Sequence, residues 1–472
     1  MIDVILLLMA VSLFFISGGC VLFFLNRLKP TTYLSNFGWP FIIFLMYSLG
    51  VGIVSLQIFL YSLFHIPLSR VVIFLPWVVI AVIIFLLRFR RERLAVRKRY
   101  LKPLREILKG VTWFEGLLFF IVAFQIIYFL VYAMSWPLVG WDAWTFWFFK
   151  AKAFYLAKGM PPDWFFLNPG PKPGEYMHPD YPLLTPLSVT WIYVCLDKID
   201  EQLAKLIFVL NAIALLSIFY YTLKQNINRL YAVFFTSLLS ITPVFIRHAG
   251  GTPIYDAVGL ADLTLSMYMF GAATFFYFYH KWKDSLFLML FFLFLGMGGW
   301  TKNEGLTYAL LGCLIAVIAV SEKKKLFWGF FIMSVIIAPW QLYKVYLLIP
   351  NEYIGFSDPL RVRMIANAGR LPFVFKTMAM EFFNFKKFGL IWPAFLLTII
   401  LNWRKAIRYP LAPCVLFLFF QILVYGFIYY ITPHDIKWQM RTSVDRIVLH
   451  LSPLALWIAA MCTHELFGTG KS

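Results

Sequence analysis

The stretch VILLLMAVSLFFISGGCVLFFL, residues 4–25, runs for 22 residues without a charged side chain. A helix of that length rises about 33 Å, which is enough to cross the ~30 Å hydrocarbon core of a bilayer. Asp3 precedes the run, without the basic segment and small-residue cleavage site of a signal peptide. We therefore expect residues 4–25 to be retained as a first membrane span.

The whole chain has the same apolar character. Of its 472 residues, 62% are hydrophobic, 20% aromatic and only 14% charged, and its mean hydropathy is +0.79. That leaves too little polar surface for a water-soluble globule, so an all-α integral membrane protein is predicted. Apolar runs near the required length predict about thirteen spans, at residues 4–25, 37–62, 69–88, 114–134, 203–223, 230–246, 257–279, 286–301, 305–320, 326–348, 388–402, 410–431 and 445–463.

The net charge of +20 is distributed in short clusters between the apolar runs. Such clusters are typical of cytoplasmic loops and argue against nucleic-acid binding, which needs a basic patch on a soluble fold. The strongest cluster, residues 88–109, is expected inside the cell. Counting spans from it places the other clusters inside as well, provided that residues 183–196 do not cross and instead lie in the interface or dip partway in. These clusters are Arg27 with Lys29, residues 224–229, Lys281 with Lys283, residues 323–325 and residues 404–408.

Two large external loops follow from this topology, residues 135–202 and 349–387, and we expect them to carry the chemistry. The five cysteines are far apart and lack metal-ligand spacing, so neither a disulfide framework nor a structural metal is predicted. No phosphate-cradling glycine loop is present, so no nucleotide cofactor is expected.

The first external loop begins with an acid among aromatic residues. Asp142 is followed by Trp144, Trp147, Phe148, Ala151 and Tyr155, which share one face of an ideal helix. This pattern predicts an amphipathic helix lying flat on the outer membrane surface, with Asp142 at its N-terminal end. The simpler interpretation is that Asp142 only caps that helix.

The same loop ends in a rigid polar turn. Prolines flank His178, Asp180 and Tyr181, which restricts their backbone. A turn that merely initiates the next helix explains the pattern equally well.

Several short motifs resemble those of membrane glycosyltransferases of the GT-C superfamily, in the branch of protein mannosyltransferases and aminoarabinose transferases. The resemblance covers residues 114 to about 463, which makes residues 1–112 an N-terminal addition of three spans and a basic loop, residues 113–463 the catalytic module and residues 464–472 a short tail. The motifs are Trp141-Asp142-Ala143, Lys150-Ala151-Lys152, His178-Pro179-Asp180-Tyr181-Pro182, Tyr255-Asp256, Ala261-Asp262-Leu263, Trp300-Thr301-Lys302-Asn303-Glu304-Gly305 and Thr442-Ser443-Val444-Asp445-Arg446.

The resemblance implies a GT-C fold, a sugar donor linked to a polyprenyl phosphate, an acceptor bound from outside, and inversion at the anomeric carbon with help from an acid of the first loop. Asp142 is the matching acid. Many relatives have Asp-Glu where this chain has Asp142-Ala143, and His-Pro-Pro where it has His178-Pro179-Asp180, which leaves the acceptor (glycan, lipid or protein) and any divalent cation open.

The expected site residues divide by chemistry. Asp142 is the candidate general base, with Asp180 as the alternative. The leaving phosphate needs fixed cations, for which Lys302, Arg441 and Arg446 are candidates; a Lys302–Glu304 ion pair is the structural alternative. The remaining expected substrate-binding residues are Lys152, His178, Asp180, Tyr181, Asp256, Asp262 and Glu304.

Two other functions fit a polytopic chain with a few membrane acids. A transporter or lipid flippase shares these features, although a large external loop favours an enzyme. A membrane oligosaccharide ligase, which uses external arginines and histidines, is kept open by Arg441, Arg446 and His450. In each case we expect a multi-pass plasma or inner membrane protein in contact with membrane lipids, with its site on the external or periplasmic side.

Overall fold

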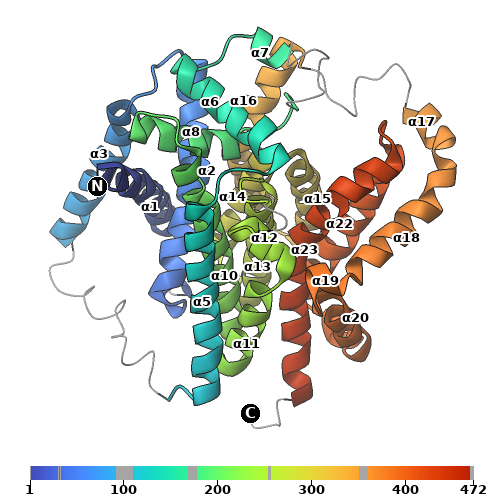
Figure 1. Ribbon diagram of the computed structural model, residues 1–472. Coiled ribbons are helices and arrows are strands. Elements are labelled where there is room, and N and C mark those ends of the chain that lie inside the picture. The colour runs from blue at the N-terminus through green and yellow to red at the C-terminus, as the bar shows by residue number, and fades with distance from the viewer. Residues whose placement is uncertain are drawn as a thin grey trace.

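The computed structural model describes residues 2–29, 31, 33–91, 110–167, 178–253, 257–349 and 360–467. These ranges contain helices and connections but no strand (Figure 1). The predicted all-α class is confirmed for this part of the chain. Asp256 and residues 92–109 of the basic stretch lie outside the described residues.

Within the described ranges, eight helices are long and apolar enough to cross a membrane, which indicates a membrane-embedded protein. A ninth span arises if α11 (Arg229–Ser240) and α12 (Pro243–Ala249), bent by 70°, are taken together. The eight are α1 (Ile2–Leu28), α2 (Trp39–Leu63), α3 (Arg70–Arg91), α5 (Trp113–Ser135), α9 with α10 (Glu201–Ala204 and Leu206–Lys224), α16 (Lys323–Leu347), α22 (Ala412–Ile431) and α23 (Ile436–Phe467).

The predicted count of about thirteen spans is not confirmed, because several apolar runs form shorter helices. α14 (Ser285–Thr301) and α15 (Asn303–Ala319) have 17 residues each, and α20 (Ile391–Leu401) has 11. The other elements are η1 (Tyr33–Asn36), η2 (Ala143–Trp147), α6 (Phe148–Ala157), α7 (Trp164–Leu167), α8 (Leu184–Leu196), α13 (Asp262–Trp282), α17 (Leu360–Ala366), η3 (Ala368–Arg370), α18 (Leu371–Phe382), α19 (Phe385–Phe388) and α21 (Trp403–Ala406).

Helix α13 is the centre of the bundle. Its residues from Asp262 to His280 are all buried, and it packs against α10, α14 and α23. The N-terminal helices join the same core, since Tyr268 of α13 donates a hydrogen bond to the Ser48 carbonyl of α2 at 2.8 Å. Trp191 of α8 donates to the Ala10 carbonyl of α1 at 2.9 Å. One continuous hydrophobic core therefore includes α1, α2 and the helices that follow α5.

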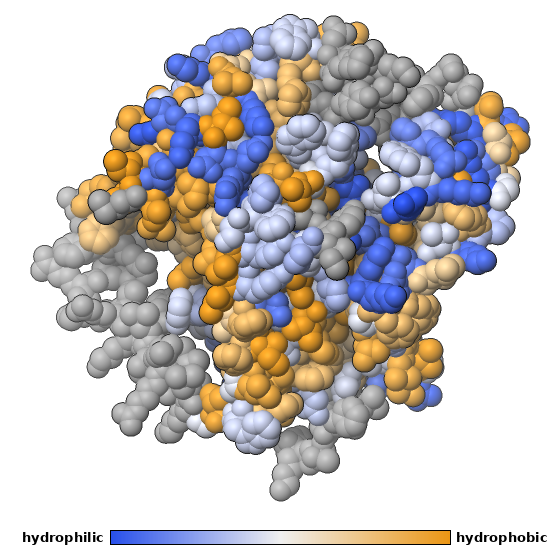
Figure 2. Space-filling view, in the orientation of Figure 1, coloured by the Kyte–Doolittle hydropathy of each residue, from blue (hydrophilic) through white to orange (hydrophobic). Residues whose placement is uncertain are grey.

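The cationic helix ends gather at one end of the bundle, the lower end in Figure 1. Lys281 at the end of α13 donates to the Asn226 side chain at 2.6 Å, and Lys325 of α16 lies 6.0 Å from the ring of Tyr279. Lys405 lines a cavity of about 370 Å³ together with Asn226. Helices α6 and α7 lie at the opposite end (Figure 1), and polar residues gather over the upper half of the face drawn in Figure 2.

The predicted amphipathic helix differs from the structure in phase and in environment. Residues 143–147 form a π-helical turn, and Phe148–Ala157 continue as α6. The wider turn rotates Trp144 away from the common face, so that 53% of it is exposed while Trp147, Phe148 and Ala151 are buried. The buried face contacts α8, where Thr190 donates to the Ala151 carbonyl at 3.2 Å, so this face is covered by protein.

Helix α8 is short and enclosed by protein. Its 13 residues are all buried, among α1, α2 and α6. A rise of about 20 Å is too small to cross a bilayer, in keeping with the expectation that residues 183–196 do not cross. It is not a surface helix with one polar face.

A cysteine in place of Lys198, at the end where α6 and α8 lie, should react in intact cells with a membrane-impermeant thiol reagent. A cysteine in place of Lys324, at the cationic end, should stay protected until the membrane is opened. Both side chains are exposed in the structure. Labelling at position 324 but not at position 198 would show that the protein has the opposite orientation in the membrane.

Helices α1 and α2 pack backbone to backbone through Gly50. A Cβ atom at this position would lie 1.7 Å from the Phe14 carbonyl oxygen, so we expect Gly50→Ala to force the two helices apart and to lower the free energy of unfolding by about 1–3 kcal/mol. Gly116→Ala in α5 is the matched control, because nothing lies within 4 Å of its Cβ. Equal melting temperatures for both variants in one detergent would refute this packing.

Candidate functional site

A buried carboxylate, Asp262, organises the polar centre of the protein. It is the first residue of α13 and is 1% exposed. Its Oδ1 accepts a hydrogen bond from Lys302 Nζ at 2.9 Å and lies 3.0 Å from His450 Nε2. Its Oδ2 lies 4.0 Å from Arg446 Nη1. Burying a charge costs free energy unless the charge is paired. Lys302, His450 and Arg446 together stabilise the buried carboxylate.

Lys302 reaches Asp262 because the chain breaks between α14 and α15. Its backbone is extended, with φ −152° and ψ 160°. The two helices meet closely at this break, since a Cβ atom on Gly305 would lie 1.9 Å from the Gly298 carbonyl oxygen. Lys302 Nζ also lies 2.9 Å from Glu304. The Lys302–Glu304 pair expected as the structural alternative is therefore present, with Asp262 as a second partner.

Arg446 joins this cluster to the segment that follows α5. Its guanidinium donates to Asp142, the residue that precedes the π-helical turn. The Asp142 side chain makes no capping hydrogen bond, so the simpler interpretation of Asp142 as a helix cap is wrong. We call Asp142, Asp262, Lys302, Glu304, Arg446 and His450 the ionic cluster.

The turn at His178–Tyr181 lies beside the ionic cluster. Asn303, the neighbour of Lys302, donates to Asp180 Oδ2 at 2.8 Å, and Asp180 is 1% exposed. The rings of His178 and Tyr181 stack at 4.8 Å, and the Tyr181 ring lies 6.0 Å from Lys302 Nζ. The structure thus brings together residues that the sequence places more than a hundred positions apart.

His450, a member of the ionic cluster, and its neighbour Tyr425 are not among the site residues that the sequence predicts. The sequence suggests a role for His450 only in the ligase alternative, and Tyr425 lies within an apolar run where nothing marks it as a site residue. Tyr425 Oη lies 2.9 Å from His450 Nδ1. Because an ionised carboxylate only accepts hydrogen bonds, His450 Nε2 donates to Asp262 and Nδ1 of a neutral ring accepts from Tyr425.

A second ionic network lies next to the first along α23. Asp445 accepts from Arg247 of α12 at 2.7 Å and lies 3.5 Å from Lys387. Lys387 also pairs with Glu381 of α18 at 2.8 Å. These contacts fix the turn of α23 that carries Arg446.

Two predicted residues lie away from the ionic cluster. Lys152 pairs with Glu201 of α9, because it lies two residues after Lys150 and so points to the opposite side of α6. Arg441 is exposed; it precedes Arg446 by five residues, which turns it about 140° around α23. Asp256, also predicted, lies outside the described residues.

The charge balance limits what the ionic cluster can do. Three carboxylates face two permanent cations and one histidine, and Lys302 is shared by two of the carboxylates. Among the described residues, no group of three or more His, Cys, Asp or Glu side chains could hold a metal ion. The arrangement can take up a proton, and Arg446 can exchange one anionic partner for another.

No family model matches the chain, and neither a curated protein nor a solved structure matches it.

Lys150 stabilises the turn at His178–Tyr181. It is buried in α6, and its Nζ donates to the His178 carbonyl at 2.6 Å. Burial lowers the pKa of the Lys150 ammonium to about 7, against the opposing charge of Asp180. This shift links the stability of the turn to pH.

Stability should rise with pH because of Lys150. Below about pH 7 both the folded and the unfolded chain keep the proton. Between pH 7 and the ordinary lysine pKa of 10.5 only the unfolded chain keeps it, so the free energy of unfolding should rise by up to about 1.4 kcal/mol per pH unit. The difference in this free energy between wild type and Lys150→Met, measured from pH 6 to 9, should be flat at first and then increase. A difference that does not change with pH would show that burial of the Lys150 ammonium does not affect stability.

Proposed function

We propose that this chain is a membrane glycosyltransferase that moves a sugar from a polyprenyl phosphate to an acceptor on the external face of the membrane. The observation that carries the proposal is the pairing of Asp142, from the first loop, with Arg446, from the last helix, on top of the buried Asp262–Lys302 pair. Asp142 is the acid that the resemblance matches to the base, and Arg446 has the guanidinium that suits a phosphate.

Asp142 is the base in this mechanism. Its side chain is 24% exposed, so an acceptor hydroxyl can reach it, and its ion pair with Arg446 orients it. As the acceptor oxygen bonds to the anomeric carbon, the bond from that carbon to the phosphate oxygen breaks and the hydroxyl proton passes to Asp142. Attack from the face opposite the phosphate inverts the anomeric centre.

Asp180 suits a structural role better. It is 1% exposed and is held by Asn303, and its backbone carbonyl accepts from Trp340 at 3.3 Å. A base without access to the acceptor cannot remove its proton. The accessibility of the two acids thus favours Asp142.

Arg446 is the better candidate for the leaving phosphate. Lys302 is already bound by Asp262 and Glu304, whereas Arg446 Nε has no hydrogen-bond partner among the described residues. A guanidinium can donate two parallel hydrogen bonds to a phosphate. Lys302 then serves to neutralise the carboxylates around the site, and the stacked rings of Tyr181 and His178 lie beside it.

Proton-coupled transport is the second candidate. The chain of hydrogen bonds from Tyr425 through His450 to Asp262 is buried, and such chains can carry protons in transporters. A transporter would need no acceptor chemistry at Asp142, so a transfer assay separates the two functions.

Asp142→Asn should reduce sugar transfer by about 10²–10⁴-fold, because an amide cannot accept the proton. The assay follows radiolabelled sugar from a panel of polyprenyl-phosphate sugars in membranes that contain wild type or variant. Arg446→Lys should retain part of the activity, since it keeps the charge and loses the fork. Asp163→Asn, an exposed acid of the same loop, is the control.

Full activity of Asp142→Asn would remove this residue as the base. Absence of transfer from every donor, with wild type folded, would favour transport.

A further inference from the structure

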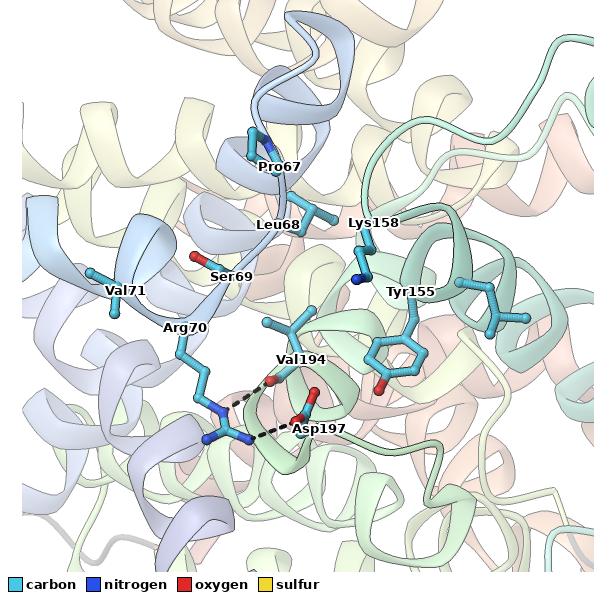
Figure 3. A pocket seen from close by; sticks show the side chains of 10 residues that line it. Pro67, Leu68, Ser69, Arg70, Val71, Tyr155, Lys158, Val194 and Asp197 are labelled. Carbon is cyan, nitrogen blue, oxygen red and sulfur yellow. Dashed lines mark hydrogen bonds and ion pairs between the residues drawn. The ribbon is translucent and has the colours of Figure 1, made fainter.

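One cavity lies apart from the ionic cluster. It measures about 650 Å³ and is enclosed by the start of α3, the end of α6 and the end of α8 (Figure 3). Arg70, Lys158 and Ser69 bring polar groups to it, and Leu68, Val71 and Leu156 bring apolar ones. None of its lining residues belongs to the ionic cluster.

The two cations of this cavity are only weakly compensated. Arg70 Nε donates to the Val194 carbonyl at 3.3 Å, and its Nη2 is 3.9 Å from Asp197, whose side chain is 84% exposed. An ion pair this long and this exposed contributes little. Figure 3 shows both Arg70 contacts as dashed lines, while the Lys158 amine extends from the end of α6 without one. Both cations can therefore turn to an anion.

An apolar surface continues from the cavity along α3. Val71, Leu75, Val79 and Val82 recur at helical spacing and are all exposed. Leu156, on the other rim, is exposed as well. An exposed apolar face of a membrane-spanning helix is covered by acyl chains.

The position of Arg70 also departs from the general distribution of cations. It begins α3, whose other end leads into the basic stretch at residues 88–109. Arg70 and Lys158 thus lie at the end of the bundle opposite the cationic helix ends. The general inside bias of lysine and arginine does not account for them.

We propose that this cavity holds the phosphate-bearing headgroup of an anionic membrane phospholipid, with the acyl chains along the outer face of α3. Arg70 and Lys158 bind the phosphate, and Ser69 and Tyr155 offer hydroxyls to the rest of the headgroup. Free phosphate would not use the apolar rim. The sugar donor would have to place its reacting carbon at Asp142, which does not line this cavity. The proposal is independent of the glycosyltransferase assignment.

The test is titration of delipidated, detergent-purified protein with phosphatidylglycerol, read by native mass spectrometry. Wild type should bind one lipid tightly. Arg70→Gln and Lys158→Asn should each weaken binding by roughly fivefold, and the two changes together by the product of both effects. Lys376→Gln removes an exposed lysine of α18 and should bind as wild type does.

Asparagine is chosen at Lys158 because the backbone there has φ 50°, a conformation that asparagine tolerates. If Arg70→Gln does not fold, the phosphatidylglycerol affinity of Lys158→Asn alone tests the proposal.

The proposal would be overturned by equal binding by the double variant, by equal affinity for phosphatidylcholine, or by displacement of the lipid by inorganic phosphate. Stronger competition by a polyprenyl phosphate would instead make the cavity part of the donor path, and so would also overturn it.

Discussion

The compensation of the buried Asp262 carboxylate determines how the polar centre of this protein is built. An isolated charge in that position would cost several kcal/mol, and its partners come from the α14–α15 break and from α23. Satisfying Asp262 therefore fixes three elements at once. Arg446 extends the constraint to Asp142 and so ties the segment between α5 and α6 to α23.

The membrane accounts for the rest of the architecture. Helices satisfy their own backbone hydrogen bonds, which is why the described residues contain no strand. Polar chemistry is then confined to helix ends and breaks, where Asp262 begins α13 and Lys302 separates α14 from α15. The Asp445 network on the neighbouring turn of α23 follows the same logic. The cationic helix ends remain at the opposite end of the bundle.

The structure brings several of the predicted site residues together, whereas the predicted count of about thirteen spans is not confirmed. Asp262, Lys302 and Arg446 were recognisable because a charge beside an apolar run needs a partner or a role. Their partners were not, since Tyr425 gives no signal and spacing cannot show that His450 meets Asp262. The π-helical turn at residues 143–147 shifted the phase of the loop helix. Charge alone also did not distinguish Arg441 from Arg446, which only the rotation of α23 separates.

The most direct test of the central claim is a double-mutant cycle on Asp262→Asn and Lys302→Met, read as the free energy of unfolding in one detergent. If Asp262 and Lys302 compensate each other, each single change should cost about 3–5 kcal/mol and the double variant clearly less than the sum. Additive losses would show that the two charges are independent and would contradict the claim that Lys302 compensates the buried Asp262 carboxylate.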